Sequence, residues 1–441
     1  MAKWENWAKT VKHSGLEKVY EPKNLNEVKA AVKEAANKGW KLRAVGSGHA
    51  WSNLGVPSRC GGAVILTEKL DKILATTADT VEVEGGITIK RLNNELFNLG
   101  LALDNMGDSN PQALAGALAT ETHGSGAEIG SISEFIEAMT IVQANGEEHI
   151  LEGDELKAGR VARGQLGVVY SVKLRVRPKY FLHHDQVFIT LRDENIPELI
   201  KNRHLEYWYY PYTGKAERIT RQIVDSTKVI NPLDLGEEWF IKIGAALVNG
   251  MGKKSPEKLP AFWKEHANTQ LFPPVERQGP SHKILLGKSN VWRDIVRTFT
   301  MEYQLDLGAD LKNFWDAVNA FDESVKVAEQ KCVFVASPVQ IRFTKKSERS
   351  LLSNLSFQPT ASFSISFFRD HDGAHTWLPE LEKRLRALGG RPHWGKMYYV
   401  QPETTAAYAA FEAIRQNLDP DGVFNFQQGV YTPDPEAFQG P

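Results

Sequence analysis

"RAVGSGHAWSNLG" (residues 43–55) sets two serines and a histidine among glycines, directly after the short apolar strand predicted for "KLRAV" (41–45). Glycines permit backbone angles that other residues avoid, and successive N–H groups in such a loop can converge on an anion. No Lys-Ser or Lys-Thr pair follows the glycines, and the third glycine of the dinucleotide-binding fingerprint is missing, so two common phosphate loops are excluded. By itself, the stretch is consistent with a pyrophosphate loop or with an ordinary turn.

Two further glycine-rich loops follow along the chain. "ATETHGSGAEIG" (119–130) sets Thr120, Thr122 and Ser125 beside two glycines, and "RGQLGVV" (163–169) adds a third loop. Each loop alone is as consistent with an ordinary connection as with a binding site. The three loops together favour a binding site, in which backbone N–H groups and hydroxyls hold phosphate.

The composition indicates a protein with more than one domain and a balanced charge. Its 441 residues are 42% hydrophobic, which is too long a chain for one simple core. With 53 basic and 54 acidic residues, no overall positive field favours a nucleic acid or an anionic membrane as partner. The charged N-terminus lacks the apolar stretch of a signal peptide, and no later segment approaches about 18 apolar residues. We therefore expect a cytoplasmic protein without a membrane segment.

The two cysteines, Cys60 and Cys332, are far apart in the sequence. This spacing excludes a disulfide framework and a zinc site of clustered cysteines. We therefore predict two small core side chains and no metal site.

Helices and strands alternate in the first part of the chain. "NLNEVKAAVKEAANKGW" (24–40) predicts a helix that begins after Asn24 and ends at Gly39, because apolar residues recur at helical spacing. "EAMTIVQANGEEHIL" (137–151) predicts a hairpin with a two-residue turn at Asn145-Gly146, where both residues need positive φ.

The pattern changes in the second part of the chain. From about residue 180 to 375, strands are rich in aromatic residues, as in "CVFVASPVQIRF" (332–343) and "SFSISFF" (362–368), with helices between them. We predict an α+β protein of two domains, divided near Pro178, with a large antiparallel sheet flanked by helices in the second domain.

An ordered series of motifs runs nearly from end to end of the chain. The motifs are "NWAKT" (6–10), "VGSGHAWSNLG" (45–55), "LALDNMGD" (101–108), "ATETHGSG" (119–126), "GQLGVV" (164–169), "VQIRFT" (339–344), "GGRPHWGK" (389–396) and "LDPDGVFN" (418–425). The series resembles one known family, the vanillyl-alcohol-oxidase (VAO) type flavoproteins. Within that family it is most similar to the branch of sugar-1,4-lactone oxidases, such as the L-gulonolactone oxidases, and alditol oxidases, of which "RPHWGK" is especially diagnostic.

The resemblance implies a domain organisation and a cofactor. It implies a PCMH-type FAD-binding domain over residues 1–178, a substrate or cap domain over 179–395, and a C-terminal segment, 396–441, that packs back on the FAD domain. His49 is implied to be joined covalently to the 8α-methyl carbon of the flavin, which prevents cofactor loss and raises the flavin's reduction potential. The other reading of His49 is a loop histidine that hydrogen-bonds phosphate or water.

The resemblance assigns FAD contacts to all three glycine loops. The first loop is implied to hold the pyrophosphate, the second to lie along the other side of the FAD, and the third to lie near its adenine end. The implied cofactor-binding residues are Val45, Gly46, Ser47, Gly48, His49, Ala50, Ser52, Thr120, Thr122, His123, Gly124, Ser125, Gly126, Gly164, Gly167, Val168 and Val169.

Oxidation of an alcohol carbon needs hydride delivery to flavin N5, removal of the hydroxyl proton and cations near the developing alkoxide. Arg342 matches the family arginine that contacts the reacting hydroxyl, and Lys396 matches a second cation. Two positions before this arginine the family usually has a carboxylate, but this chain has Gln340, which cannot act as a base. Either Lys396 or His393 accepts the proton, or the hydride leaves first and the alkoxide loses its proton to water.

The leading hypothesis is an FAD-dependent oxidoreductase that oxidises a hydroxyl of an aldono-1,4-lactone of the L-gulono, L-galactono or D-arabinono type. Oxygen, giving hydrogen peroxide, or another acceptor would take the electrons. The first alternative is an alditol oxidase acting on xylitol or sorbitol. The second is a flavin-binding protein without turnover, since a fold does not fix a function. The expected partners are therefore small molecules.

Overall fold

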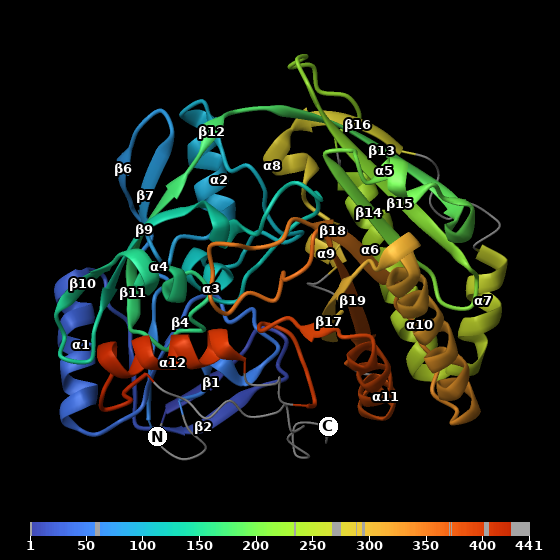
Figure 1. Ribbon diagram of the computed structural model, residues 1–441. Coiled ribbons are helices and arrows are strands. Elements are labelled where there is room, and N and C mark those ends of the chain that lie inside the picture. The colour runs from blue at the N-terminus through green and yellow to red at the C-terminus, as the bar shows by residue number, and fades with distance from the viewer. Residues whose placement is uncertain are drawn as a thin grey trace.

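The structure is an α+β fold whose two halves lie side by side, one around several small sheets and one around a large sheet (Figure 1). The computed structural model describes residues 2–57, 62–232, 235–266, 275–287, 289–292, 296–369, 371, 373–400 and 405–424.

Four small sheets and short helices form the first half. A five-stranded antiparallel sheet has the order β10-β9-β11-β7-β6, a parallel sheet has the order β3-β5-β4, and β1-β2 and β12-β8 are two-stranded. The elements are β1 (Ala2–Glu5), β2 (Lys12–Leu16), β3 (Lys18–Tyr20), α1 (Leu25–Asn37), β4 (Leu42–Val45), β5 (Ala63–Leu66), β6 (Ile73–Thr76), β7 (Thr80–Glu84), α2 (Ile89–Asn98), β8 (Leu101–Ala102), α3 (Leu114–Ala119), β9 (Ile136–Val142), β10 (Glu148–Leu151), α4 (Gly153–Gly159), β11 (Val168–Arg175) and β12 (Arg177–Pro178).

An eight-stranded antiparallel sheet forms the centre of the second half, in the order β16-β13-β15-β14-β18-β19-β17-β20. The elements of this half of the chain, followed by helix α12, are β13 (Phe181–Thr190), α5 (Ile196–Leu199), β14 (His204–Tyr209), β15 (Lys215–Val224), α6 (Leu235–Lys254), α7 (Leu259–His266), β16 (Val275–Pro280), α8 (Ser281–Ile284), α9 (Ser289–Trp292), β17 (Thr298–Asp306), α10 (Lys312–Gln330), β18 (Val339–Thr344), β19 (Thr360–Phe368), α11 (Ala374–Ala387), β20 (Arg391–Pro392) and α12 (Ala406–Leu418).

The predicted first helix is confirmed as α1. The Asn24 side chain accepts a hydrogen bond from the N–H of Glu27, and Gly39 follows the helix with φ of +67°. Val28 and Val32 are fully buried, since they lie on the face that packs on the parallel sheet.

The predicted hairpin forms from β9 and β10, but its two-residue turn is wrong. Val142 pairs with Glu148, and the N–H of Gly146 donates to the carbonyl of Gln143 at 2.8 Å. Gly146 has φ of +76°, whereas Asn145 does not have a positive φ. The connection is a longer loop closed by one left-handed glycine, which also satisfies the twist of the strands.

Two predictions around residue 332 are also wrong. The strand expected over 332–343 begins only at Val339, after Pro338. Cys332 is exposed and has φ of +58°, since it lies in the turn that follows α10. Cys60, the other predicted core cysteine, lies outside the described residues.

The central strands of the large sheet have one apolar and one polar face. Met301, Ile341 and Phe363 lie on the face that packs on α10 and α11, the helices on the outer side of the sheet in Figure 1. Because side chains alternate along a strand, Glu302 and Arg342 point to the opposite face. That polar face is turned toward the first half of the molecule, as contacts across the interface show below.

The chain returns to the first half at its C-terminal side. Helix α12 packs its buried Phe411 and Leu418 into the core that contains α2 and α3 (Figure 1). The N–H of Leu42 in β4 then donates to the carbonyl of Val423 at 2.9 Å. The segment after β20 therefore contributes to the packing of the first half.

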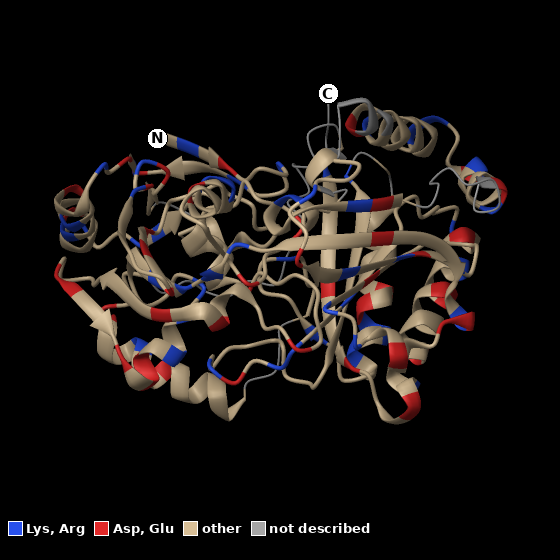
Figure 2. Ribbon diagram, turned by 90° about the horizontal axis from the view of Figure 1, so that it is seen from above, with Lys and Arg blue, Asp and Glu red and all other residues tan. Residues whose placement is uncertain are grey.

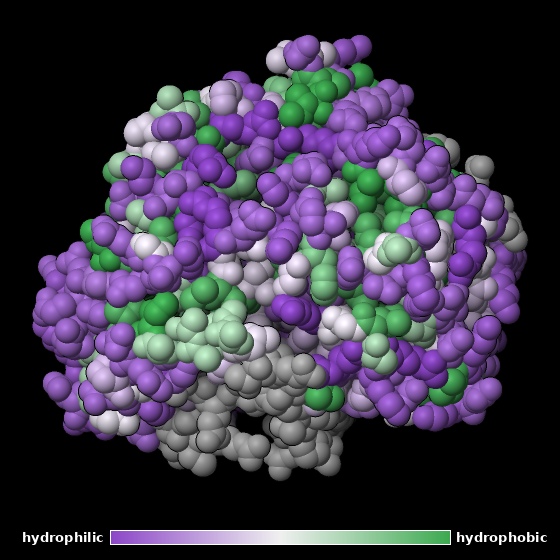
Figure 3. All heavy atoms as spheres, viewed as in Figure 1, coloured by the Kyte–Doolittle hydropathy of each residue, from purple (hydrophilic) through white to green (hydrophobic). Residues whose placement is uncertain are grey.

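The surface carries charges of both signs. In the view of Figure 2, basic and acidic residues alternate over both halves without a face of one sign. Figure 3 shows hydrophobic residues in small areas, one of them over α12, separated by hydrophilic ones. Among the described residues, no helix combines the length and the apolar character needed to cross a bilayer.

A buried arginine ties these segments together. The guanidinium of Arg43 donates to the carbonyls of Leu54, Arg163, Gly164 and Phe424, at distances of 2.5 to 2.8 Å. It therefore links β4 to two loops and to the C-terminal segment.

We expect Arg43→Met to lower the free energy of unfolding by about 3 kcal/mol or more, because buried carbonyls lose their donors. Urea denaturation of the purified protein measures this change. Arg175→Met is the matched control, since Arg175 is an exposed arginine of β11 whose loss should cost less than about 0.5 kcal/mol. Equal stability of the two variants would contradict the tethering role.

Candidate functional site

A large cleft lies between the two halves. Its empty volume is about 1880 Å³, which includes space open to solvent. The glycine loops of the first half form one wall, and the polar face of β17, β18 and β19 forms the other. The cleft can therefore take a long ligand that reaches from the glycine loops to the sheet.

Most of the predicted cofactor residues line this cleft. They are Val45, Gly46, Ser47, Gly48, His49, Ala50, Ser52, Thr120, Thr122, His123, Gly164, Gly167 and Val169. The four predicted catalytic residues, Gln340, Arg342, His393 and Lys396, line it as well. The fold thus brings together residues that are up to 351 positions apart in the sequence, from Val45 to Lys396.

Four predicted cofactor residues lie outside the cleft lining: Gly124, Ser125, Gly126 and Val168. The N–H of Gly126 donates to the carbonyl of Phe343 at 2.6 Å, and the carbonyl of Ser125 accepts from His204 Nδ1 at 2.7 Å. The end of the second glycine loop therefore joins the first half to the large sheet.

The first glycine loop has the form of an anion cradle. A Cβ atom on Gly46 would lie 2.2 Å from Cβ of Ala113, so only glycine permits this close approach of two loops. Gly48 has φ of +61°. Within the described residues, the backbone N–H groups of Ser47 and Gly48 donate to no protein acceptor. Free donors at the cleft wall fit the pyrophosphate of FAD.

Aromatic rings fix the position of His49. Its ring stacks on Trp7 with centroids 4.9 Å apart and an interplanar angle of 14°, and Trp7 meets Trp51 edge-on at 5.8 Å. Lys396 Nζ lies 4.0 Å from the centre of the Trp51 ring. The indole N–H of Trp51 donates to the carbonyl of Thr298 at 2.6 Å, so this wall also connects the two halves.

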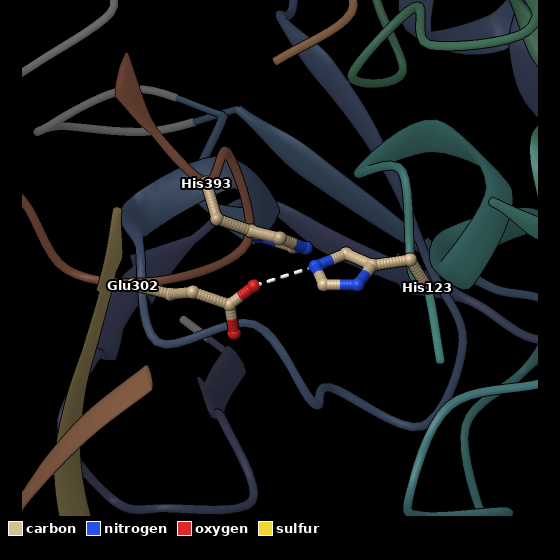
Figure 4. Close-up of side chains that lie close together, drawn as sticks. All are labelled: His123, Glu302 and His393. Carbon is tan, nitrogen blue, oxygen red and sulfur yellow. Dashed lines mark hydrogen bonds and ion pairs between the residues drawn. The ribbon is translucent and has the colours of Figure 1, made fainter. Parts of the chain in front are cut away.

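A buried ion pair lies at the centre of the sheet wall. Arg342 donates to Glu302 Oε2 at 3.0 Å and to the carbonyl of His123 at 2.9 Å, while His123 Nε2 lies 2.6 Å from Glu302 Oε1. Figure 4 shows this last contact with His393 beside it. Although burial opposes ionisation, Arg342 and His123 hold the pKa of Glu302 well below its ordinary value.

The other two candidates at the sheet wall have lowered pKa values. Burial lowers the pKa of His393 to about 3, and its Nδ1 accepts the N–H of Gly395 at 3.0 Å, so the ring is neutral. Burial also lowers the pKa of Lys396 to about 8. Lys396 therefore carries its charge in most molecules at neutral pH and loses it slightly above.

One group of side chains could hold a metal ion. Ligand atoms of His123, Glu302 and His393 lie within 4.8 Å of one another, and all three residues are buried. The second oxygen of Glu302 already binds Arg342. The buried negative charge is thus balanced by a guanidinium, and the group is satisfied without a metal.

A second polar group surrounds Gln340. Its Nε2 donates to Asp108 Oδ2 and, at 2.8 Å, to Glu206 Oε1. Glu206 is held further by Arg221 at 3.1 Å and by the indole N–H of Trp208 at 2.6 Å. The neutral amide of Gln340 therefore lies between two carboxylates.

The sequence interpretation missed Asp108, Glu206 and Glu302. Glu302 lies in "TFTMEYQLD" (298–306), where polar residues alternate with apolar ones, so a polar strand face could have been expected. Asp108 ends the quoted motif "LALDNMGD", but nothing in the sequence indicates which strand its loop faces. Tyr303, interpreted as a packing residue, is fully buried beside α11.

Comparisons with known proteins agree with this architecture. The profile of a family described as "D-arabinono-1,4-lactone oxidase" matches residues 172–428, and that of an "FAD binding domain" matches residues 17–152. The chain is 29% identical to an L-gulono-1,4-lactone dehydrogenase of Mycobacterium tuberculosis and 28% identical to an L-gulonolactone oxidase of Bos taurus, with 96% of each chain covered. It is 24% identical to a D-arabinono-1,4-lactone oxidase of Candida glabrata, covering 99% of this chain and 92% of the relative.

The structure is also similar to solved structures. A solvent-stable cholesterol oxidase superposes with a TM-score of 0.78 at 18% identity, covering 96% of this chain and 95% of the other. At this identity the likeness shows the fold alone, a VAO-type FAD-binding fold with a large antiparallel sheet.

We expect Glu302→Gln to lower the free energy of unfolding by about 3 kcal/mol or more at pH 7, because it removes the buried carboxylate that binds both Arg342 and His123. The pKa of Glu302 is lowered in the folded protein, so the ion pair stabilises the fold above the unfolded pKa of about 4.3. The difference between the two proteins should begin to shrink below that value and be lost as the pH falls through the lower pKa of the folded protein. Urea denaturation at pH 7 and pH 3 measures this change.

Glu382→Gln is the matched control. Glu382 is equally buried, but its carboxylate binds the Tyr303 hydroxyl and two backbone N–H groups, and burial raises its pKa. A neutral amide should therefore lower the free energy of unfolding less at position 382 than at position 302. An equal loss in both variants, unchanged with pH, would rule out the ion pair as the source.

Proposed function

The chain belongs to the D-arabinono-1,4-lactone oxidase family and contains an FAD-binding domain, and on this premise we propose that it oxidises a hydroxyl group of an aldono-1,4-lactone. The observation that carries the proposal is the cleft, whose lining combines an anion cradle with two cations, Arg342 and Lys396. FAD has a pyrophosphate for the cradle and a ring system that would reach the cations.

The cofactor would lie along the glycine loops. Ser47 and Gly48 would donate N–H groups to the pyrophosphate, and His49 would form the covalent bond to the flavin. Once bound, the flavin supplies a hydride acceptor that passes electrons to oxygen or to another acceptor. Trp7 stacks on His49 and holds its ring at the cleft wall, which supports a fixed attachment point.

The sheet wall would bind the reacting hydroxyl. Arg342 is permanently charged, since Glu302 compensates it in the buried wall, and Lys396 adds a second cation. Both cations lower the energy of the negative charge that develops on the substrate oxygen as its proton leaves. Neutral residues of β17 and β19, including Thr300 and Ser366, line the same part of the cleft and suit a polyhydroxy ligand.

The pKa values limit the roles of two predicted bases. His393 is neutral, but a group with a pKa of about 3 holds a proton weakly. Lys396 is mostly protonated at pH 7, which suits a cation better than a base. We propose that Lys396 acts as a cation and that His393 positions neighbouring groups.

A covalent flavin can be tested by acid precipitation. We expect the yellow colour to remain with the wild-type precipitate, and the flavin of His49→Ala to appear in the supernatant instead, because the attachment atom is gone. His149→Ala is the control, since His149 is a half-exposed histidine bound to Glu155 on the surface. Flavin released from the wild-type protein by acid would exclude the covalent bond.

The substrate class can be tested by anaerobic mixing. L-gulono-, L-galactono- or D-arabinono-1,4-lactone should bleach the flavin absorbance, while xylitol should not. Bleaching by xylitol alone would replace the lactone with an alditol, and no bleaching by any of the four would contradict the proposed oxidation.

The role of Lys396 follows from the pH dependence of flavin reduction. As a cation it must be protonated, so the rate constant should fall as the pH rises through about 8. In Lys396→Met this fall of the rate constant with pH should be absent, and flavin reduction should be roughly 100-fold slower. Lys346→Met, at an exposed lysine, is the control. A rate that rises through pH 8 would assign Lys396 as the base instead.

A further inference from the structure

Position 340 holds a glutamine where the family that the sequence resembles usually has a carboxylate, and the structure places another carboxylate beside it. Asp108 follows β8 and lines the cleft. Its Oδ2 accepts a hydrogen bond from Gln340, and its Oδ1 lies 3.6 Å from Arg342 Nη1. A negative charge therefore still faces Arg342, but it comes from the opposite half of the molecule.

Only one of the two carboxylates bound to Gln340 belongs to the cleft lining. Glu206 is 2% exposed and pairs with Arg221 behind the wall. The Asp108 side chain is 14% exposed and lies among the residues that line the cleft. A substrate hydroxyl in the cleft can thus reach Asp108, whereas Glu206 is occupied by its own cation.

The amide of Gln340 fits this arrangement, and a carboxylate would not. Its two N–H groups can each serve one carboxylate, Asp108 and Glu206. A glutamate at position 340 would place a third negative charge between them, without a proton to donate. Because Gln340 is neutral, Asp108 supplies one negative charge beside Arg342. A single carboxylate at position 340 would supply the same charge.

We propose that Asp108 replaces the carboxylate missing from position 340 and accepts the hydroxyl proton of the substrate. This inference rests on the proposed lactone oxidation. The C–H bond breaks with its electron pair, which leaves as hydride to the flavin, the oxidant. The O–H bond breaks and its proton joins a carboxylate oxygen of Asp108, while the carbon and oxygen form a carbonyl group. Arg342 and Lys396 stabilise the oxygen during the transfer.

The surroundings of Asp108 suit a base. Burial and Glu206 raise the pKa of its carboxyl, while Arg342 and Arg221 oppose the rise. Lys396 faces the carboxyl from the loop after β20. A pKa above the usual value of about 3.9 brings the group closer to neutral pH, where a base is most effective.

The backbone holds Asp108 in place. Its carbonyl accepts the N–H of Gly287 at 3.0 Å, and a Cβ atom on Gly287 would lie 3.0 Å from Cβ of Asp108. The loop is therefore packed closely against the second half, and its carboxylate has a fixed direction.

A charge-exchange experiment tests the proposal. Asp108→Asn should slow flavin reduction by lactone roughly 100-fold and remove the loss of rate at low pH, because the base is gone. Adding Gln340→Glu to Asp108→Asn should raise the rate of flavin reduction at least tenfold over Asp108→Asn alone, because a carboxylate again lies beside Arg342. Asp104→Asn is the control, since Asp104 lies in the same segment but pairs with Arg177 and Arg203. Asp108→Asn with wild-type rate and pH profile would overturn the proposal.

A second measurement needs no substrate. Gln340→Glu alone should lower the midpoint of thermal unfolding of the flavin-loaded protein, because three carboxylates then meet, and adding Asp108→Asn should restore it. Additive shifts would overturn the charge exchange. If no lactone reduces the wild-type flavin, the proposed function and the proton transfer both fail, and the unfolding midpoints alone decide the charge exchange. If lactone reduces the wild type and Asp108→Asn equally, only the role of Asp108 fails.

Discussion

The Arg342–Glu302 ion pair is the interaction on which the cleft depends. Both residues lie on the polar face of the large sheet, Arg342 on β18 and Glu302 on β17, the two strands that flank β19. Buried charges are tolerated only when they are paired and hydrogen-bonded, so this face must be closed by groups that complete the pairing. The first half supplies them with His123 and Asp108. The same contacts that neutralise the sheet face therefore hold the two halves together and form the wall of the site.

Local structure could be predicted from the sequence where neighbouring residues determine it. The cap at Asn24 and the helical spacing of α1 act within a few residues, and both are present in the structure. The two-residue turn at Asn145-Gly146 failed because the dipeptide also suits a longer loop with one left-handed residue. The prediction that Cys332 is a core residue was wrong because its apolar side chain was taken as evidence of burial, although the chain turns sharply there.

The site was harder to predict, since its groups converge only after folding. Arg342 and Lys396 could be named from their motifs, but Asp108 comes from a loop more than two hundred residues before them. Alternation in β17 indicates a polar face without indicating what covers it. Likewise, the motif around His49 suggests a cofactor loop, whereas the Trp7 ring that orients His49 comes from the N-terminal segment. A pattern in one segment cannot report the partner that another segment provides.

The cleft carries a nearly balanced set of charges, and this balance limits how a proton can move in it. Arg342 and Lys396 oppose Glu302 and Asp108 at the reacting end. Glu302 cannot take a proton readily, because Arg342 and His123 both favour its ionised form. A proton passed to Asp108 stays inside the same group of charges, so the proton transfer itself does not change the total charge of the wall and substrate. A carboxylate on the loop of the first half, in place of one on strand β18, thus keeps a negative charge beside Arg342 during alcohol oxidation. The base then comes from the first half of the molecule instead of from the large sheet.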